Sequence, residues 1–284
     1  MASMSKAKPE NRALPKRFYT AVAVQQSADG FGIALDGKLL RTQGRNPLHV
    51  ASQQLAGAIA DEWEAQAEFI NPDTMPLARL INLTIDRVPA DRAALLMELA
   101  RYGQTDLVCY RAPQDAVIAR QSRSNPASSV CETITLSAPN SWIASALEGP
   151  RNDESLRQRQ DTIFTPILDW LRAAYGIDLA VTEGVMPVAQ STASQQRMAA
   201  LFAEASDGQL AALCMMVPLL GSAVLALAVW KGRIAVEEAL IAARLDEDFQ
   251  AEKWGADPLA VAAWEAKARD VRASGFFLTH NALK

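Results

Sequence analysis

The chain has 284 residues, half of them hydrophobic, which is enough to build a substantial core in one large or two modest domains. Lys and Arg number 28 against 32 Asp and Glu, so the formal net charge is −4. This balance argues against a nucleic-acid-binding protein, which normally carries a basic face.

The first 17 residues are polar and basic and contain no apolar stretch. A secretory signal needs about 7–15 apolar residues in its central region, so this segment is not one. We expect residues 1–17 to form a disordered tail. The cysteines Cys109, Cys131 and Cys214 are widely spaced and form no CxxC pair, which favours reduced thiols in a cytosol-like compartment.

Antiparallel β structure is predicted for roughly residues 18–50. The apolar runs RFYTAVAVQQ and FGIAL flank SADG, and Asp36-Gly37 separates FGIAL from KLLRT. Asp-Gly between apolar runs favours a tight hairpin, because glycine accepts the positive φ that such turns need. The PLHV stretch that follows is predicted to add a short strand. We therefore expect a small β-rich N-terminal domain over residues 18–74.

Helices are predicted for most of the remaining chain. Ser52 is a candidate cap for a helix whose apolar stripe runs through Leu55, Ile59 and Trp63. Pro76 is placed to occupy the first turn of another helix, and ADRAALLMELARYG is predicted to form the next. Further helices are expected at 166–175, 192–206, 209–230, 234–254 and 257–273. The fold class is therefore predicted as α+β, with a larger mainly helical domain over 75–284.

Two segments interrupt this pattern. TDLVCY, at 105–110, is short, apolar and β-branched, and is predicted to return to a strand. Residues 112–148 are rich in Ser, Ala, Pro and Asn and show no sustained period, which is typical of a flexible insertion.

Residues 210–230 contain no charge and are long enough to span a bilayer. Pro218, Gly221 and Ser222 interrupt the segment, and the chain has no second apolar segment of this length. A helix that is apolar all round is equally typical of the centre of a helical domain. A buried helix is favoured, and a membrane-associated protein anchored by this segment is the alternative.

The usual parts of an active site are missing from the sequence. The two histidines, His49 and His280, have no catalytic context, and HExxH, GxSxG, GxGxxG and P-loop motifs are absent. Asp248 and Glu252 lie one helical turn apart and would suit a hard cation. A carboxylate-metal hydrolase is therefore kept as an alternative, but a solvated helix face is favoured and no cofactor is expected.

The stretch LDEDFQAEKWGADP, at 245–258, combines five carboxylates with two aromatic residues. Leu245 and Phe249 are predicted to face the core at i, i+4 spacing. Glu247 and Glu252 then point away from that stripe, beside Trp254. Acidic groups around an exposed tryptophan would make a protein-binding rim. The alternative is a purely structural role, with the tryptophan in the core and the acids in solvent.

Several motifs occur in a characteristic order along nearly the whole chain: RFYTAVAV, LDGKLLRT, LAGAIADEWEAQ, INPDTMPLARL, DLVCYRA, PILDWL and AARLDEDFQAEKWG. Together they resemble the assembly chaperone family that binds the α subunit of the ATP synthase catalytic head in mitochondria and α-proteobacteria. The long insertion after DLVCYRA departs from the family pattern, which has a short connector there.

The resemblance implies a non-enzymatic chaperone that shields the unassembled α subunit until the β subunit replaces it. It also implies a buried helix at 210–230, no nucleic-acid partner and no stable membrane insertion. A monomer when free is expected, in the bacterial cytoplasm or the mitochondrial matrix. The residues predicted to bind the partner are Glu62, Trp63, Gln66, Glu247, Glu252 and Trp254.

Overall fold

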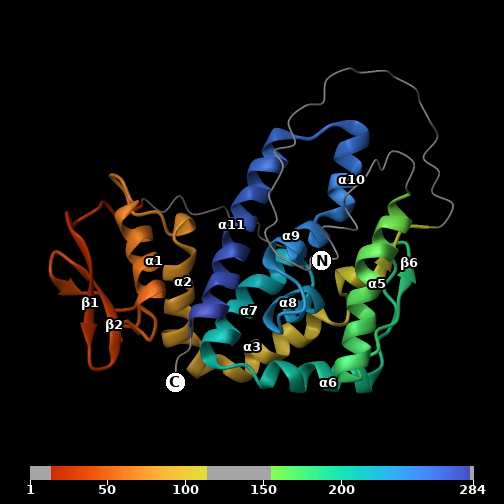
Figure 1. Ribbon diagram of the computed structural model, residues 1–284, viewed down its shortest axis with the longest axis horizontal. Coiled ribbons are helices and arrows are strands. Elements are labelled where there is room, and N and C mark those ends of the chain that lie inside the picture. The colour runs from red at the N-terminus through yellow and green to blue at the C-terminus, as the bar shows by residue number, and fades with distance from the viewer. Residues whose placement is uncertain (1–13, 114–154, 282–284) are drawn as a thin grey trace, which may run out of the picture.

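The computed structural model describes residues 14–113 and 155–281, with a small antiparallel sheet at one end of a mainly helical body (Figure 1). This confirms the predicted α+β fold class. The N-terminal elements are β1 (Val22–Ser27), β2 (Gly30–Leu35), β3 (Lys38–Leu39), β4 (His49–Val50), α1 (Gln53–Glu64), a 3₁₀ turn (Pro72–Thr74) and α2 (Pro76–Asn82).

Helix α2 continues through a π-helical turn into the long helix α3. From that turn onward the elements are the π turn (Leu83–Arg87), α3 (Val88–Tyr102), a 3₁₀ turn (Leu107–Cys109), β5 (Tyr110–Arg111), α5 (Leu156–Tyr175), β6 (Thr182–Glu183), α6 (Thr192–Ala203), α7 (Asp207–Leu220), α8 (Ala223–Trp230), α9 (Val236–Ala243), α10 (Leu245–Trp254) and α11 (Pro258–His280). Strands β5 and β6 pair in parallel, so the strand predicted in TDLVCY is correct only at Tyr110.

The predicted hairpins are present in the sheet. Strand β2 pairs antiparallel with β1, β3 and β4, so it lies at the centre. Asp36 and Gly37 form the two-residue turn between β2 and β3, with φ of 46° and 78°. Positive φ at both positions identifies the turn type for which Asp-Gly is preferred. The strand predicted in PLHV is confirmed at His49–Val50.

Replacement of Gly37 by valine is expected to cost more than about 1 kcal/mol of folding free energy. A Cβ at this position would meet no atom within 4 Å, so the cost comes from the positive φ alone. Gly37→Asn should cost less, because asparagine tolerates that φ. Urea unfolding measures both variants, and a valine variant with the parent's midpoint would contradict the turn assignment.

The described chain includes four residues that were predicted to belong to the tail. Residues 14–17 fall in the predicted tail, yet Lys16 forms an antiparallel bridge with Phe69. The Arg17 guanidinium donates to the Glu64 carbonyl at 3.0 Å, across 47 residues of sequence. The tail prediction was therefore wrong for these four residues, because their partners are too distant in sequence to be recognised. Residues 1–13 lie outside the described part of the chain.

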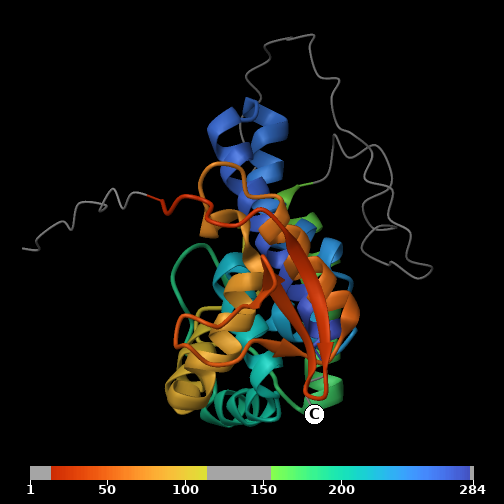
Figure 2. The same ribbon diagram turned by 90° about the vertical axis from the view of Figure 1, so that its left-hand side faces the viewer.

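Two apolar clusters form the core. The N-terminal cluster lies between the sheet and helices α1 and α2, with Ile33 and Leu80 at 0% exposure (Figure 2 views the molecule from this side). The larger cluster fills the helical part. Ala212 of α7 and Phe277 of α11 belong to the N-terminal cluster, so these helices join the two parts. The predicted domain boundary at 74/75 stays a prediction, and the N-terminal cluster extends beyond it to Ile81.

The apolar segment 210–230 is buried, but it is two helices. Gly221 adopts φ of 65° after the last turn of α7, a conformation that ends helices. Ser222 then caps α8 by accepting from the backbone NH of Leu225 at 2.9 Å. The single helix predicted over 209–230 was therefore wrong. Within the described ranges, no helix is long and apolar enough to cross a membrane.

A buried carboxylate holds this break in place. Asp106 is 0% exposed and accepts from the Ser222 hydroxyl at 2.6 Å and from the Val224 NH at 3.0 Å. It also accepts from the Val108 NH at 3.2 Å, so it caps its own 3₁₀ turn and the start of α8 together. Burial raises the pKa of Asp106 to about 6, against the lowering effect of these donors.

Other helix limits differ from the predictions. The helix predicted over 234–254 breaks at Arg244 into α9 and α10. Helix α5 begins ten residues before the predicted 166–175, because Ser155 and Gln158 form a capping box. Helix α11 extends beyond the predicted 257–273 to reach His280.

Two predictions fall largely outside the described residues. Only Ala112 and Pro113 of the predicted insertion at 112–148 are described. Cys131 also lies outside the described ranges, whereas Cys109 and Cys214 are free thiols. Burial raises the pKa of both free thiols to about 12.

Candidate partner-binding surface

Helix α10 is anchored by its apolar side. Leu245 and Phe249 are each 5% exposed, which confirms the predicted core stripe. Two cations lie over the Phe249 ring: Arg159 Cζ is 5.1 Å and Lys253 Nζ 4.6 Å from its centroid. The anchored side fixes which side chains of α10 face outward.

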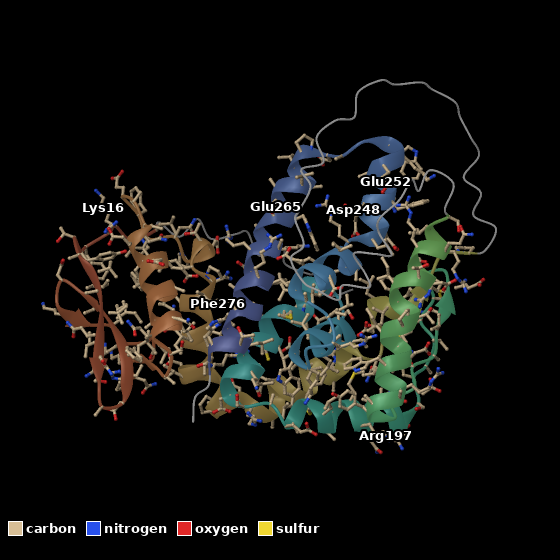
Figure 3. All side chains as sticks on the ribbon, viewed as in Figure 1. Lys16, Arg197, Asp248, Glu252, Glu265 and Phe276 are labelled. Carbon is tan, nitrogen blue, oxygen red and sulfur yellow. The ribbon has the colours of Figure 1, made fainter. Side chains whose placement is uncertain are left out.

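Three carboxylates of α10 are held by neighbouring side chains (Asp248 and Glu252 are labelled in Figure 3). Asp246 accepts from Gln160 Nε2 at 2.8 Å, and Asp248 pairs with Arg244 at 2.8 Å. Burial is the main cause that raises the pKa of Asp248. These acids therefore serve the local structure of α10 and its contact with α5.

Glu252 is the third of these: its side chain faces solvent, as predicted, but it is also paired. Its Oε1 lies 2.8 Å from Nη1 of Arg159, whose side chain is only 5% exposed. Glu252 thus neutralises a buried cation on α5. Glu247, in contrast, makes neither a hydrogen bond nor an ion pair with any described residue and is exposed.

A hollow of about 220 Å³ lies where α10 meets α11. We call this end of the two helices the α10–α11 tip, and it projects from the helical body in Figure 1. Trp254 is 65% exposed there and Leu259 is 80% exposed. The hollow is lined by Arg244, Glu247, Gln250, Ala251, Trp254, Gly255, Ala256, Asp257, Ala260 and Val261. The predicted pair Glu247 and Trp254 is therefore brought together on one exposed surface.

Glu62 occupies a different place, inside the N-terminal part. Its carboxylate accepts from the backbone NH groups of Leu77 and Ala78, each at 2.8 Å. These NH groups belong to the first turn of α2 and have no acceptor within the helix, and the helix dipole favours a negative charge there. Glu62 therefore fastens α1 to the start of α2.

Gln66 and Trp63 are also engaged within this part. Gln66 is 5% exposed, and its side chain donates to the Glu62 carbonyl at 2.9 Å and accepts from the Asn71 NH at 2.8 Å. The Trp63 ring packs edge-on against Tyr19 with centroids 5.7 Å apart. These contacts favour a structural role within the N-terminal part over direct partner contact.

The two predicted groups are separate. Figure 1 shows α1 and α10 on opposite sides of α11. Helix α11 touches both regions: Arg79 of α2 pairs with Asp270 of α11 at 2.5 Å, and the tip lies at the N-terminal end of the same helix. The N-terminal part and the tip are therefore linked through one rigid element.

A pH-dependent stability is expected from Glu62. Burial raises its pKa from 4.5 to about 7, despite the two backbone donors and Arg79. The folded state therefore binds the proton of the Glu62 carboxyl group more tightly than the unfolded state does. Protonation of Glu62 stabilises the fold fully below about pH 4.5, and this stabilisation is lost as the pH rises through 7. Between pH 5 and pH 8 the parent should lose about 2–3 kcal/mol relative to Glu62→Gln. Urea unfolding at each pH checks this, and a constant difference between the proteins would contradict it.

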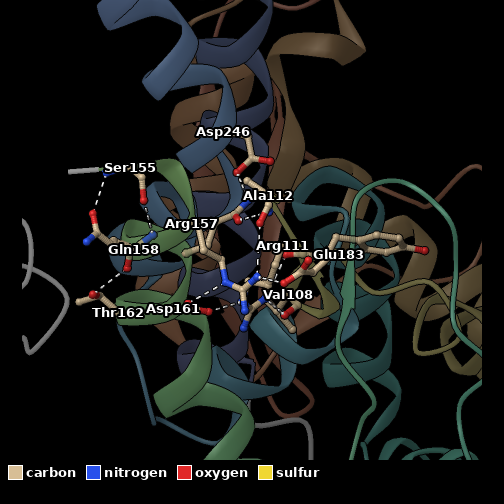
Figure 4. A network of polar contacts seen from close by, with 12 residues as sticks. Val108, Arg111, Ala112, Ser155, Arg157, Gln158, Asp161, Thr162, Glu183 and Asp246 are labelled. Atoms are coloured by element: carbon tan, nitrogen blue, oxygen red, sulfur yellow. Dashed lines mark hydrogen bonds and ion pairs between the residues drawn. The ribbon is translucent and has the colours of Figure 1, made fainter. Parts of the chain in front are cut away.

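A polar network that the sequence analysis missed joins β5, β6 and α5 (Figure 4). Arg111, whose side chain is 1% exposed, donates to Asp161 at 3.0 Å. Asp161 also accepts from Arg157 at 2.7 Å, and Arg157 pairs with Glu183 at 2.7 Å. Ala112 donates its NH to Gln160 of the same helix at 2.7 Å. The network fastens the chain on both sides of residues 114–154.

Metal chemistry finds no support in the described ranges. No three His, Cys, Asp or Glu side chains there lie together as a metal site requires. The pair proposed for a cation, Asp248 and Glu252, is divided between Arg244 and Arg159. Each arginine neutralises one of the two carboxylates that a cation would need.

Comparison with known proteins decides the family. A model described as the ATP12 chaperone protein matches residues 16–172, more than half of the chain. The chain belongs to the ATP12 chaperone family. Its structure resembles the crystal structure of Atp12 from Paracoccus denitrificans, at 32% identity over 94% of this chain and 98% of that one, with a TM-score of 0.71. A candidate chaperone from Agrobacterium tumefaciens is 35% identical over 94% of this chain and 86% of that one, with a TM-score of 0.73.

The resemblance to the ATP synthase assembly chaperones is therefore confirmed, and this ATP12-family protein is a chaperone and not an enzyme. The family match ends within α5, so it does not include the α10–α11 tip. The likeness to solved ATP12 structures, in contrast, covers 94% of the chain.

Proposed function

We propose that this ATP12-family chaperone binds the unassembled α subunit of the ATP synthase catalytic head through the α10–α11 tip. The observation that carries the proposal is the exposed pair Trp254 and Glu247 beside the hollow. Trp254 exposes 65% of its surface on a helix whose other side is anchored. Tryptophan is among the residues most enriched in protein-binding hot spots.

The chemistry of the proposed contact has two parts. Trp254 and Leu259 would cover apolar surface that the α subunit exposes before assembly, which otherwise promotes aggregation. Glu247 would face a basic group of the α subunit, which adds orientation and specificity. The contact is released when the β subunit competes for the same surface, since the sequence has no nucleotide-hydrolysis motif.

The other predicted residues enter the proposal as supports. Glu252 holds α10 against α5 through Arg159, and Glu62 holds α1 against α2. Gln66 fastens the segment between α1 and α2, and Trp63 packs on Tyr19. The free chaperone is proposed to be a monomer in the bacterial cytoplasm, or in the mitochondrial matrix if the chain is eukaryotic.

The test replaces the two exposed residues separately. Glu247→Lys and Trp254→Ala should each weaken α-subunit binding at least about tenfold, while unfolding midpoints stay near the parent's, because surface changes cost about 0.5 kcal/mol or less. Glu98→Lys, the same charge change at an exposed position of α3, is the matched control and should bind normally. Light scattering of isolated α subunit measures the protection.

The proposal fails if both tip variants protect the α subunit as well as the parent does. A loss of binding shared by Glu98→Lys would also contradict it, because net charge and not the tip would then be responsible.

A further inference from the structure

No described residue pairs with the outer edge of β1. Among the described strands, β1 pairs with β2 alone and so ends the sheet on that side. It has six residues, whereas β3 and β4 have two each. The other edges of this sheet are thus shortened, as natural edges usually are, and the β1 edge is not.

The register shows which backbone groups point outward. Asp36 NH donates to the Ala21 carbonyl at 2.9 Å, and Leu40 NH donates to the Ile33 carbonyl at 2.8 Å. Ile33 therefore turns its backbone groups toward β3, and its partner Val24 turns its own away from β2. By the same alternation, the NH and carbonyl groups of Val22, Val24 and Gln26 face outward along the edge.

The edge also lacks the usual protection. VAVQQS contains no charge and no proline, the two devices that most often block strand addition. Val24 is 36% exposed, and Phe18, just before the strand, is 71% exposed. An incoming strand would therefore find free hydrogen-bonding groups flanked by uncovered apolar surface.

We propose that this edge binds an extended, uncharged segment of the α subunit by strand addition. The inference rests on the proposed function, because it assigns a second contact to the same partner. A row of free strand groups is matched by another extended backbone, which fixes the conformation of the bound segment. An apolar side chain of that segment would lie beside Val24.

The size of the edge favours the α subunit over a second copy of this chain. A stable complex buries about 1,200–2,000 Å² in total, and one added six-residue strand falls well short of that. The edge therefore suits a chain that is already held elsewhere on the molecule, as the α10–α11 tip would hold the α subunit. A linked second contact then strengthens binding without being stable alone.

Amide hydrogen exchange on the unmodified full-length protein tests the proposal directly. Adding isolated α subunit should slow exchange of the Val22, Val24 and Gln26 amides at least about tenfold. The Ala23 and Gln25 amides point toward β2 and should be slow with or without the α subunit. Equal exchange of the outward amides in both states overturns the proposal.

Val24→Pro provides the matching substitution. Proline removes an outward NH and leaves the β1–β2 hydrogen bonds in place, which an edge strand tolerates. We expect an unfolding midpoint close to the parent's and α-subunit binding about tenfold weaker. Val24→Ala keeps the NH and should weaken binding less.

The outcomes separate the two proposals. Normal binding by Val24→Pro overturns the edge contact and leaves the tip contact standing. Slow, concentration-dependent exchange of the outward amides without α subunit assigns the edge to a second copy and overturns the proposal. An α subunit that does not bind the parent protein overturns both.

Discussion

Replacing Phe249 with alanine is expected to lower the free energy of unfolding by about 3–5 kcal/mol, the range measured for buried phenylalanines. The ring is 5% exposed and lies beside Arg159 and Lys253, so its loss leaves a cavity and removes two cation–π contacts. Arg159 also pairs with Glu252, so the same change loosens the joint between α5 and α10.

Urea unfolding of Phe249→Ala measures this cost, with Phe249→Leu as the control that keeps most of the apolar volume. The leucine variant should lose much less stability. Because α10 carries Glu247, the alanine variant should also protect the α subunit poorly. A Phe249→Ala protein with the parent's stability would show that α10 is not anchored by this ring.

Asp106→Ala is expected to have a comparable effect, about 3–4 kcal/mol. The change leaves the Ser222 hydroxyl and the Val108 and Val224 NH groups without an acceptor in a fully buried site. Each buried donor left unpaired costs about 1–3 kcal/mol. The start of α8 should therefore lose the group that holds it against the turn after α3.

Chemical unfolding again provides the measurement, with two comparisons. Asp106→Asn keeps an acceptor oxygen of similar shape and should cost less than the alanine variant. Asp91→Ala removes an exposed aspartate of α3 and should change stability by about 0.5 kcal/mol or less. Equal stabilities for Asp106→Ala and Asp91→Ala would show that Asp106 does not hold the start of α8 in place.

The parts of the fold that were predictable depend on local chemistry. Asp36-Gly37 specifies its turn through the two residues that occupy it, and Ser52 caps α1 through the Leu55 NH three residues away. The stripe Leu245 and Phe249 follows from helical spacing alone. In each case the determining groups lie within four residues of each other.

The parts that were missed depend on distant partners. The break between α7 and α8 is held by Asp106, 116 residues before Ser222. Gly221 and Ser222 were visible in the sequence as interruptions, but their partner was not. A long segment without charged residues therefore concealed two helices.

In the candidate site, too, the features set by nearby residues were predictable and those set by distant partners were not. The sequence placed Glu247 and Trp254 on one surface, because both lie on one short helix. It could not separate Glu247 from Glu252, since the Arg159 that binds Glu252 lies 93 residues earlier. Glu62 likewise resembles a surface acid until the NH groups of α2 are placed against it.

The network around Arg111 bears on how the chain tolerates change in length. Ala112 receives a hydrogen bond from Arg157 and donates one to Gln160, so the chain before residue 114 is tied to the first turns of the helix that begins after residue 154. Both ties are made by residues outside 114–154, so a change in the number of residues between them leaves these contacts intact. Because the free energy of closing a loop rises by only about 0.6 kcal/mol for each doubling of its length, a reporter peptide inserted between residues 114 and 154 should cost little folding free energy.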